Sequence, residues 1–328
     1  MNEKILYEMK NTAPVLRDFI NYNLVVKGKS QLTVQEYYTD LRTFFRYIKI
    51  LRNIANDSED FEKIDISDID IDLIKTITLT DVYEFLNFCI NDRSNNSTTL
   101  ARKTSSLRTF FKYLTNKVNL IDINPLEILD TPKIKKSLPK YLTLEESVRL
   151  LEAVDGPNKA RDYCILTLFL NCGMRLSELC NINLTDIRDN RTVCITGKGN
   201  KERTIHLNEA CVNAINDYLQ VRPHEGVVDK DALFISRLGK RISNKTVQHI
   251  VYTTLDKAGL SGRGLSTHKL RHTAATLMYQ YGDVDIRVLK DLLGHENLNT
   301  TEIYTHLSNK ELKNASDSNP LNNIKNKK

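Results

Sequence analysis

The apolar residues of this chain recur mainly three or four positions apart, which is the spacing that places side chains on one face of an α-helix. Between Leu32 and Ile50 this spacing is carried by Val34, Tyr38, Leu41, Phe45 and Ile48. The stretches 81–90 and 97–114 repeat the pattern. The first 115 residues are therefore predicted to form a small helical bundle.

The length and composition of the chain favour a globular protein of two domains. It has 328 residues, of which 41% are hydrophobic and 27% are charged, whereas a typical domain holds about 100–150 residues. No apolar run approaches the ~20 residues of a membrane span, and no apolar stretch follows the charged first residues. We therefore expect a soluble cytoplasmic protein without a membrane segment or secretory signal.

The net charge and the cysteine content give only weak information about the partners and the cellular compartment of the protein. The formal net charge of +6 is compatible with a nucleic-acid partner but is too small to establish one. The six cysteines form no C-x-x-C pair and mostly interrupt apolar helical patterns. They are predicted to be buried thiols in a reducing compartment, and neither a disulfide framework nor a metal site is expected.

The helical spacing stops between residues 116 and 142, where we predict a basic interdomain linker. Asn124-Pro125 and Thr131-Pro132 restrict the backbone of this stretch. Four lysines cluster near its end, namely Lys133, Lys135, Lys136 and Lys140. A second domain then begins, because the Thr143 hydroxyl and the Glu146 carboxylate have the spacing of a capping box at a helix start.

The second domain, residues 143–315, is predicted to be mostly helical with a small antiparallel sheet. Two β-branched runs, 191–196 and 202–207, flank a glycine-rich turn at 197–201 that is typical of a hairpin. Helices are expected at 158–171, 176–180, 208–221, 243–258, 267–281, 284–293 and 300–307. The chain as a whole is thus expected to be mainly α, and its polar tail, residues 316–328, to be mobile.

Five separated segments of the second domain supply chemically active side chains. They are Gly173 to Leu179, the turn around Lys198, His268 to His272, Leu292 to His295, and Tyr304 to His306. Each has an ordinary explanation when taken alone, because surface arginines, Gly-Lys-Gly turns and packed tyrosines are common. His272 and His306 are interpreted as structural neighbours of the other groups.

Taken together in this order, the segments resemble the tyrosine recombinase family, and most closely its Xer-type site-specific members. The resemblance is carried by the R-L-S-E-L run, the G-K-G-N-K-E-R hairpin, the H-K-L-R-H helix and the nine-residue interval from His295 to Tyr304. It covers the second domain nearly end to end and extends more loosely to the first. It implies a helical core-binding domain over 12–115 and a mixed α/β catalytic domain over 143–315.

The resemblance also implies that the chain cleaves and rejoins DNA. Its six catalytic positions are Arg175, Lys198, His268, Arg271, His295 and Tyr304. Bare chemistry supports these roles, because a guanidinium is permanently charged and forks onto two oxygens of a phosphate. His268 lies three residues before Arg271, on the same helix face, where it can accept the proton of a tyrosine or bind the phosphate. Glu178 is expected to orient Arg175 or the local backbone.

Tyr304 is the expected nucleophile. A tyrosine hydroxyl ionises only near pH 10 in water, so nearby cations and a base must ionise it during attack. Lys198, at the tip of a hairpin, is expected to protonate the departing 5′ oxygen, while His295 adds a hydrogen bond to the phosphate. Because the phosphotyrosine preserves the bond energy and the arginines neutralise charge, neither ATP nor a metal nor another cofactor is expected.

The polar faces of two helices are candidates for contacts with double-stranded DNA. They carry Thr98, Arg102, Lys103 and Arg108 in the first domain, and Arg241, Lys245 and Gln248 in the second. An ordinary solvated helix face is the alternative for each residue. The acidic stretch 57–72 departs from the family pattern, and we interpret it as a solvated excursion.

Strand exchange joins two duplexes through four active sites, so the resemblance implies a homo- or hetero-tetramer on DNA that passes through a Holliday junction. A second recombinase or a DNA translocase is a candidate regulatory partner. Resolution of chromosome or plasmid dimers is the expected Xer-like role. The alternatives are a mobile-element integrase or invertase of the same family, a type IB topoisomerase, and a catalytically silent DNA-binding protein.

Overall fold

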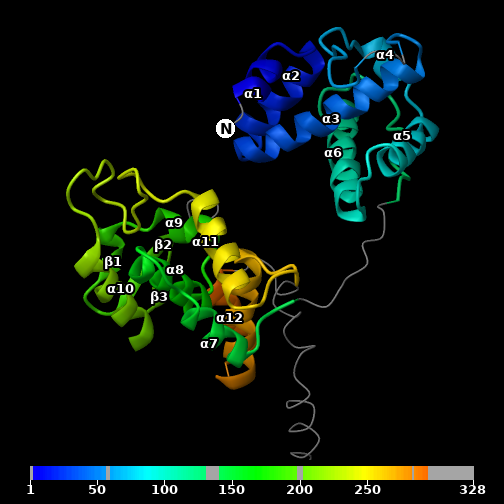
Figure 1. Cartoon of the computed structure of the whole chain (residues 1–328). Helices are drawn as coiled ribbons and strands as arrows, with labels where there is room; N and C mark the ends of the chain where they lie inside the picture. The colour runs from blue at the N-terminus through cyan, green and yellow to red at the C-terminus, as the bar shows by residue number, and fades with distance from the viewer. Residues whose placement is uncertain (1–2, 57–59, 131–139, 198–201, 283, 295–328) are drawn as a thin grey trace, which may run out of the picture. The chain divides into compact units, whose positions relative to one another are not determined.

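The computed structural model describes residues 3–56, 60–130, 140–197, 202–282 and 284–294. The chain divides between Lys136 and Ser137 into two compact units, which we call the N-terminal and the C-terminal unit (Figure 1). The described residues are mainly helical and contain a small antiparallel sheet, which confirms the predicted fold class.

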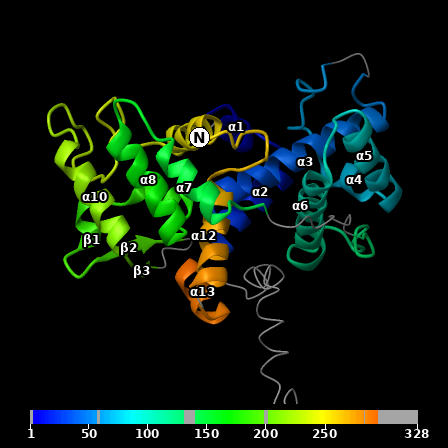
Figure 2. The same ribbon diagram turned by 60° about the horizontal axis from the view of Figure 1, so that its bottom comes forward.

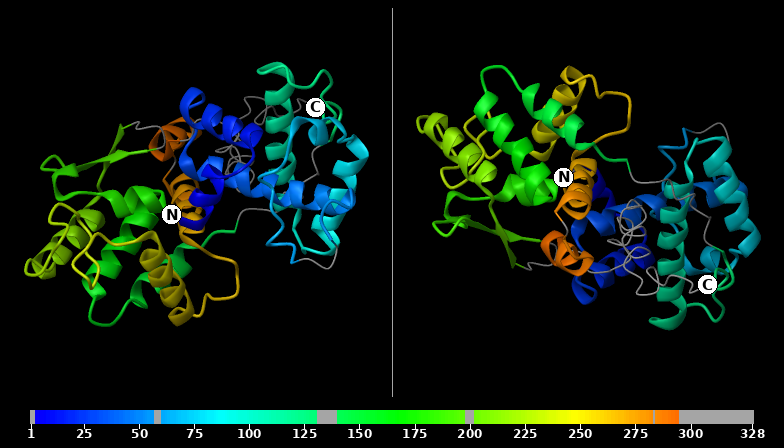
Figure 3. Two further views of the ribbon diagram at one scale, coloured as in Figure 1. Left: turned by 90° about the horizontal axis from the view of Figure 1, so that it is seen from above. Right: turned by 90° about the horizontal axis from the view of Figure 1, so that it is seen from below.

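The N-terminal unit is built around the long helix α3 (Gln31–Leu51), against which α6 (Ser97–Asn116) packs (Figures 1 and 3). Its other elements are α1 (Glu3–Lys10), α2 (Pro14–Asn21), the π-helical turn η1 (Tyr22–Val26), α4 (Ile71–Lys75) and α5 (Leu79–Asn91). The three helices expected from apolar spacing lie within two residues of their predicted bounds. The short helices α1, α2 and α4 were not predicted, because so few residues carry too weak a periodic signal.

Aromatic side chains from α3 and α6 fill the core of this unit. The periodic positions from Val34 to Ile48 are all buried, which confirms the predicted apolar stripe of α3. The rings of Phe45 and Phe110 meet edge to face, with their centroids 5.8 Å apart, which is a favoured geometry for aromatic pairs. The two helices are therefore fixed against each other by a shared aromatic interior.

The N-terminal unit extends beyond residue 115, where the linker was expected to begin. Ile121, Leu126 and Leu129 are buried in the same core as α3 and α6. The loss of helical spacing was identified correctly from the sequence, but irregular backbone can still carry core side chains. Residues 131–139, which contain most of the lysines of the predicted linker, lie outside the described residues.

The acidic stretch 57–72 is not simply a solvated excursion. Ile64, Ile66 and Ile69 alternate with exposed residues and are buried in the unit. Two buried cations of α3 bind acidic side chains of this stretch, Arg46 to Glu62 at 2.8 Å and Lys49 to Asp68 at 2.8 Å. The stretch is thus anchored by an apolar edge and by ion pairs to α3; residues 57–59 lie outside the described residues.

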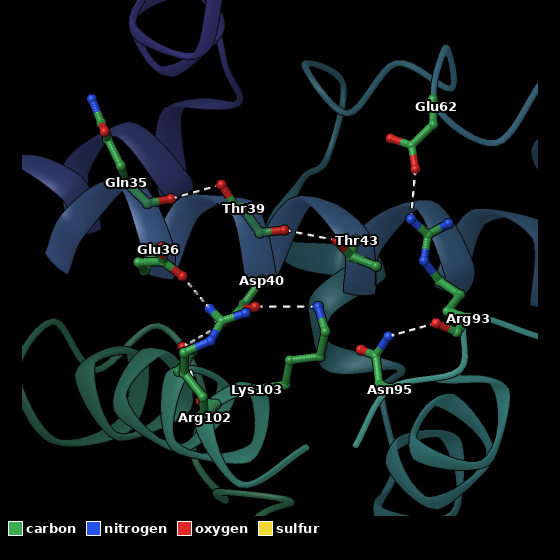
Figure 4. A network of polar contacts seen from close by, with 11 residues as sticks. Gln35, Glu36, Thr39, Asp40, Thr43, Glu62, Arg93, Asn95, Arg102 and Lys103 are labelled. Atoms are coloured by element: carbon green, nitrogen blue, oxygen red, sulfur yellow. Dashed lines mark hydrogen bonds and ion pairs between the residues drawn. The ribbon is translucent and has the colours of Figure 1, made fainter. Parts of the chain in front are cut away.

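A buried carboxylate, Asp40 of α3, ties this helix to α6 (Figure 4). It is fully buried and accepts hydrogen bonds from Arg102 at 2.6 Å, Lys103 at 3.2 Å and Ser106 at 2.7 Å. Arg102 also bridges to Glu36. The expectation that Lys103 lies on the outer polar face of α6 is wrong, because the residue is only 6% exposed and its ammonium neutralises Asp40.

The C-terminal unit packs helices around α8 (Lys159–Cys172), which is buried along most of its length. α10 (Glu209–Val221), α12 (Thr267–Tyr281) and α7 (Leu144–Glu152) pack against it (Figure 2). The remaining helices are α9 (Leu176–Asn181), the 3-10 turn η2 (Leu184–Asp186), α11 (Asn244–Lys257) and α13 (Ile286–Leu293). α7 begins with the predicted capping box, in which Thr143 and Glu146 each bond the other's backbone N–H.

The sheet consists of β1 (Ile187–Arg188), β2 (Thr192–Thr196) and β3 (Glu202–His206) in sequential antiparallel order. The register pairs Thr192 with His206 and Thr196 with Glu202, so β2 and β3 are the arms of the expected hairpin. Val193, Ile195 and Ile205 face the core. The tip of the hairpin, residues 198–201, lies outside the described residues, as do the predicted helix 300–307 and the tail 316–328.

The predicted burial of the thiols is confirmed for five of the six cysteines, and Cys194 is half-buried. Burial raises the pKa of Cys89 and of Cys180 to about 11, so these thiols are unreactive at neutral pH. In the described part of the chain, no group of three or more metal-binding side chains is found. No helix among the described residues has the length and apolar composition of a membrane span.

The Asp40 cluster generates a prediction about stability. Asp40→Ala leaves the Lys103 ammonium buried without a counter-charge, so the N-terminal unit should lose about 3–5 kcal/mol. The paired change Asp40→Leu with Lys103→Met removes both charges and should cost much less. Hydrogen exchange of the slowest amides of α3 and α6 measures the loss, and the amides of α8 in the other unit are the internal control. An unchanged exchange rate in Asp40→Ala would contradict this account.

Candidate active site

The site begins where α8 ends. Gly173 has a left-handed backbone (φ +58°) and ends α8, as a C-terminal glycine should. A Cβ at this position would lie 2.8 Å from the Leu293 side chain, so glycine is required for space as well as for conformation. The turn places Arg175 as the N-cap residue of α9, with its side chain 37% exposed.

Glu178, in the first turn of α9, is the central acid of the site. Its side chain is 2% exposed and accepts hydrogen bonds from the Arg175 guanidinium at 2.7 Å and from the Arg175 backbone N–H at 2.7 Å. Arg203 of β3 donates to both carboxylate oxygens, at 2.8 and 2.9 Å. Burial by itself raises the pKa of Glu178, but the bonds from Arg203 and Arg175 outweigh it and lower the pKa to about 2. Glu178 thus binds both partners expected for it, the Arg175 side chain and the local backbone.

Arg271 reaches the same place from α12. Its side chain is 3% exposed, and its Nη1 lies 3.9 Å from Glu178. The same nitrogen donates to the carbonyl of Gly173 at 2.7 Å, and Nη2 donates to that of Leu293 at 2.6 Å. The guanidinium of Arg271 is therefore fixed between the end of α8 and the end of α13.

The backbone carbonyls at the end of α13 bind Arg175, Arg203 and Arg271. The last carbonyls of a helix have no partner within the helix, and here consecutive ones accept from different guanidiniums. Leu292 accepts from Arg203 at 3.2 Å, Leu293 from Arg271 at 2.6 Å and Gly294 from Arg175 at 2.8 Å. The negative end of the helix dipole adds to this attraction. Strands β2 and β3 approach α13 in both views of Figure 3.

His268 precedes Arg271 by one turn of α12 and is an exposed residue whose ring is partly desolvated. This desolvation, together with the charges of Lys269, Arg271 and Arg175, lowers the pKa of its imidazole below 6.5. The ring nitrogens Nε2 of His268 and His272 lie 3.1 Å apart. At neutral pH His268 is thus an uncharged imidazole next to two cations, which suits a proton acceptor.

The structure brings together three of the six predicted catalytic residues, namely Arg175, His268 and Arg271. Lys198, His295 and Tyr304 lie outside the described residues. In the sequence, Lys198 falls between β2 and β3, and His295 directly follows Gly294. Sequence reasoning assigned no role to Arg203, although the E-R pair that ends the hairpin motif contains it.

The residues proposed to contact DNA differ in their exposure and in their hydrogen-bond partners. Thr98, Lys245 and Gln248 are exposed, whereas Arg102 and Arg108 are half-buried. Arg241 does not extend from the surface as a solvated side chain. Its guanidinium binds Asp229, Asn183 and the carbonyls of Cys180 and Ile182, and so holds the loop before α11 to the end of α9. We therefore do not assign Arg241 to DNA.

Comparison with known proteins decides the family. Residues 140–311 match the Phage integrase family. The chain is 55% identical over 308 residues to the tyrosine recombinase XerC of Caldanaerobacter subterraneus subsp. tengcongensis, covering 94% of this chain and 87% of the relative. The chain belongs to the phage integrase family. It is a Xer-type site-specific tyrosine recombinase, an enzyme that cleaves and rejoins DNA.

Two further comparisons agree with this identification. The recombinase is 35% identical over 312 residues to XerC of Thermodesulfovibrio yellowstonii, covering 93% of this chain and 95% of the relative. The crystal structure of the XerH site-specific recombinase bound to difH substrate in a pre-cleavage complex has a TM-score of 0.67 and 25% identity, with 89% of this chain and 81% of that chain covered. The recombinase thus shares both sequence and fold with the Xer group over most of its length.

The low pKa of Glu178 generates a prediction about acid stability. A carboxyl whose folded pKa is about 2, against an ordinary 4.5, stabilises the fold above pH 4.5 by about 3 kcal/mol. That contribution is lost as the pH falls from 4.5 through 2. Glu178→Gln should therefore melt at a lower temperature than the wild type at pH 7, and the gap should narrow as the solution is acidified. Melting followed by circular dichroism tests this, and a gap independent of pH would contradict it.

Proposed function

We propose that Tyr304 attacks a DNA phosphate held by Arg175 and Arg271, with His268, His295 and Lys198 completing the site. The observation that carries the proposal is that Arg175 and Arg271 meet at the end of α13, with His268 close enough to both for their charges to lower its pKa. The chain continues from this point directly into His295, and Tyr304 follows nine residues later. His295 and Tyr304 therefore follow this point in the sequence, while Lys198 falls between β2 and β3.

The arginines address the main barrier to the reaction. A phosphodiester carries a negative charge that repels nucleophiles, and further charge accumulates on its non-bridging oxygens in the transition state. Arg175 and Arg271 supply permanent positive charge, and their bonds to Glu178 and to backbone carbonyls fix their orientation before substrate arrives. Electrostatic stabilisation by groups held in place in this way is usually the largest single contribution to enzymatic catalysis. His295 is assigned a hydrogen bond to the same phosphate.

Two proton transfers accompany the exchange of bonds. The Tyr304 oxygen forms a bond to phosphorus while its proton passes to His268, and the bond from phosphorus to the 5′ oxygen breaks. Lys198 gives its proton to that oxygen, which leaves as a hydroxyl. The product is a 3′-phosphotyrosine, and an incoming 5′ hydroxyl reverses the steps to rejoin the strand. One phosphate ester replaces another throughout, so no ATP is consumed.

The similarity to XerC proteins favours double-stranded DNA as substrate and dimer resolution of chromosomes or plasmids as the biological role. Exchange of strands between two duplexes through a Holliday junction needs four such sites, so we assign a tetramer on DNA, in the cytoplasm. A second recombinase or a DNA translocase as regulatory partner belongs to the same proposal. Integration or inversion by a mobile-element enzyme of this family is the alternative role.

The assignment of Tyr304 is tested by covalent capture of DNA. The wild type should retain labelled duplexes selected from a random-sequence library on a denaturing gel, whereas Tyr304→Phe should retain none while binding the same duplexes under native conditions. The phenyl ring keeps the packing of the tyrosine but lacks the attacking oxygen. Retention by Tyr304→Phe would show that another residue is the nucleophile.

The lowered pKa of His268 sets the pH dependence of cleavage. An imidazole accepts a proton only when neutral, so the single-turnover rate should fall as the pH drops below the His268 pKa, which lies below 6.5. Between pH 7 and 8 this residue should leave the rate unchanged. His268→Gln should be slower, by roughly 10²–10⁴-fold, and should lack the acidic limb. An identical pH profile in this variant would contradict the role of base.

A further inference from the structure

We propose that Arg203 is a positioning residue of the recombination reaction, which holds Glu178, and through it Arg175, in the orientation needed at the scissile phosphate. This inference rests on the proposed function, because it refers to the phosphate assigned to Arg175 and Arg271 there. Arg203 is the second residue of β3 and follows the hairpin turn that contains Lys198. Its side chain is only 16% exposed.

The carboxylate of Glu178 is shared evenly between Arg175 and Arg203. Oε1 accepts from Nη1 of Arg175 at 2.7 Å and from Nη1 of Arg203 at 2.8 Å. Oε2 accepts from the backbone N–H of Arg175 at 2.7 Å and from Nη2 of Arg203 at 2.9 Å. The two-pronged bond from Arg203 therefore fixes the plane of the carboxylate, and this plane in turn directs the guanidinium of Arg175.

Loss of Arg203 would leave each oxygen of Glu178 with a single one of these bonds. We expect the carboxylate to bind other donors in their place, because an unpaired buried charge strongly destabilises the fold. Nη1 of Arg271 is already 3.9 Å from Glu178 and donates to the Gly173 carbonyl. Rotation of the carboxylate toward Arg271 would then move both phosphate-binding arginines away from their present positions.

A second contact links Arg203 to the end of α13. Its Nε donates to the carbonyl of Leu292 at 3.2 Å. Gly294 provides the room, since a Cβ there would lie 3.0 Å from Nη1 of Arg203. Arg203 thus joins strand β3 to the turn from which the chain proceeds to His295. A lysine at position 203 keeps the charge, but its single nitrogen cannot reproduce the planar fork that binds both oxygens of Glu178 and the Leu292 carbonyl.

The simpler alternative is that Arg203 forms an ion pair that only stabilises the fold. The two roles are separated by the charge of the substrate. If Arg203 acts by aligning Arg175 with a negative phosphate, its loss should matter little where the scissile phosphate is neutral. If it only stabilises the fold, its loss should slow cleavage of every substrate equally.

The experiment uses duplexes that the full-length wild type selects from a random-sequence library by covalent retention. Each is prepared with an ordinary scissile phosphate, with a neutral methylphosphonate, and with a sulfur atom in place of the bridging 5′ oxygen. The last form needs no proton on its leaving group and therefore reports on Lys198. The variants are Arg203→Met and Arg203→Lys, and Arg188→Met, which removes an exposed arginine of the same sheet, is the matched control.

Arg203→Met should form the covalent adduct roughly 10–100-fold more slowly than the wild type on the ordinary phosphate, the usual effect of removing an orienting contact. The rate of adduct formation by Arg203→Lys should lie between those of the wild type and Arg203→Met. On the methylphosphonate most of this difference should disappear, whereas the sulfur substrate should retain it. Arg188→Met should match the wild type on all three substrates.

Equal slowing on the charged and neutral substrates would overturn the proposal, and so would an unchanged rate. Recovery on the sulfur substrate alone would also overturn it, because Arg203 would then act through Lys198. If Arg203→Met does not fold, the same comparison is made with Arg203→Lys, whose charge is retained. Absence of any adduct in the wild type would instead reject the assignment of Tyr304.

Discussion

Three guanidinium groups, those of Arg175, Arg203 and Arg271, surround one carboxylate in the interior of the C-terminal unit. Positive charges at such short range repel one another, and the repulsion is strong where water is excluded. Glu178 offsets it with four hydrogen bonds, while the carbonyls at the end of α13 accept one more from each arginine. One negative charge among three positive ones leaves the cluster with an excess that suits an anionic ligand. The fold around this cluster serves to bring α8, α9, α12, α13 and β3 to the same place.

The N-terminal unit also contains a buried carboxylate paired with cations, but this cluster has a different role. Asp40 is as buried as Glu178, but its partners Lys103 and Arg102 come from the helix packed against it, and the cluster serves to join α3 to α6. The C-terminal cluster combines partners from separate elements and keeps the Arg175 side chain partly exposed. A buried carboxylate therefore holds a helix pair in one unit and orders a candidate phosphate site in the other. The difference lies in where the cations come from, which is a single neighbouring helix for Asp40, but α9, α12 and β3 for Glu178.

The sequence was sufficient to predict the structure where a local pattern of residues determines a helix or its end. Apolar spacing located α3, α5 and α6, the Thr143 and Glu146 pair located the start of α7, and Gly282 and Gly294 marked the ends of α12 and α13. It was insufficient where a polar side chain finds its partner far along the chain. The Lys103 ammonium and the Arg241 guanidinium bind acceptors about 60 residues away, so a local polar-face pattern could not separate them from exposed neighbours. Arg203 was missed for the same reason, since its partners lie in α9 and α13.

For Tyr304 to react as proposed, the scissile phosphate must occupy the space in front of Arg175 and Arg271, within reach of Tyr304. A crystal structure of Tyr304→Phe bound to a selected duplex measures this directly. We expect guanidinium nitrogens of both arginines within hydrogen-bonding distance of non-bridging oxygens on a single phosphorus, with the ring of residue 304 facing that phosphorus opposite the 5′ oxygen. A duplex whose phosphates all lie beyond reach of these arginines, or a ring of residue 304 directed away from the bound phosphate in every subunit, would contradict the account.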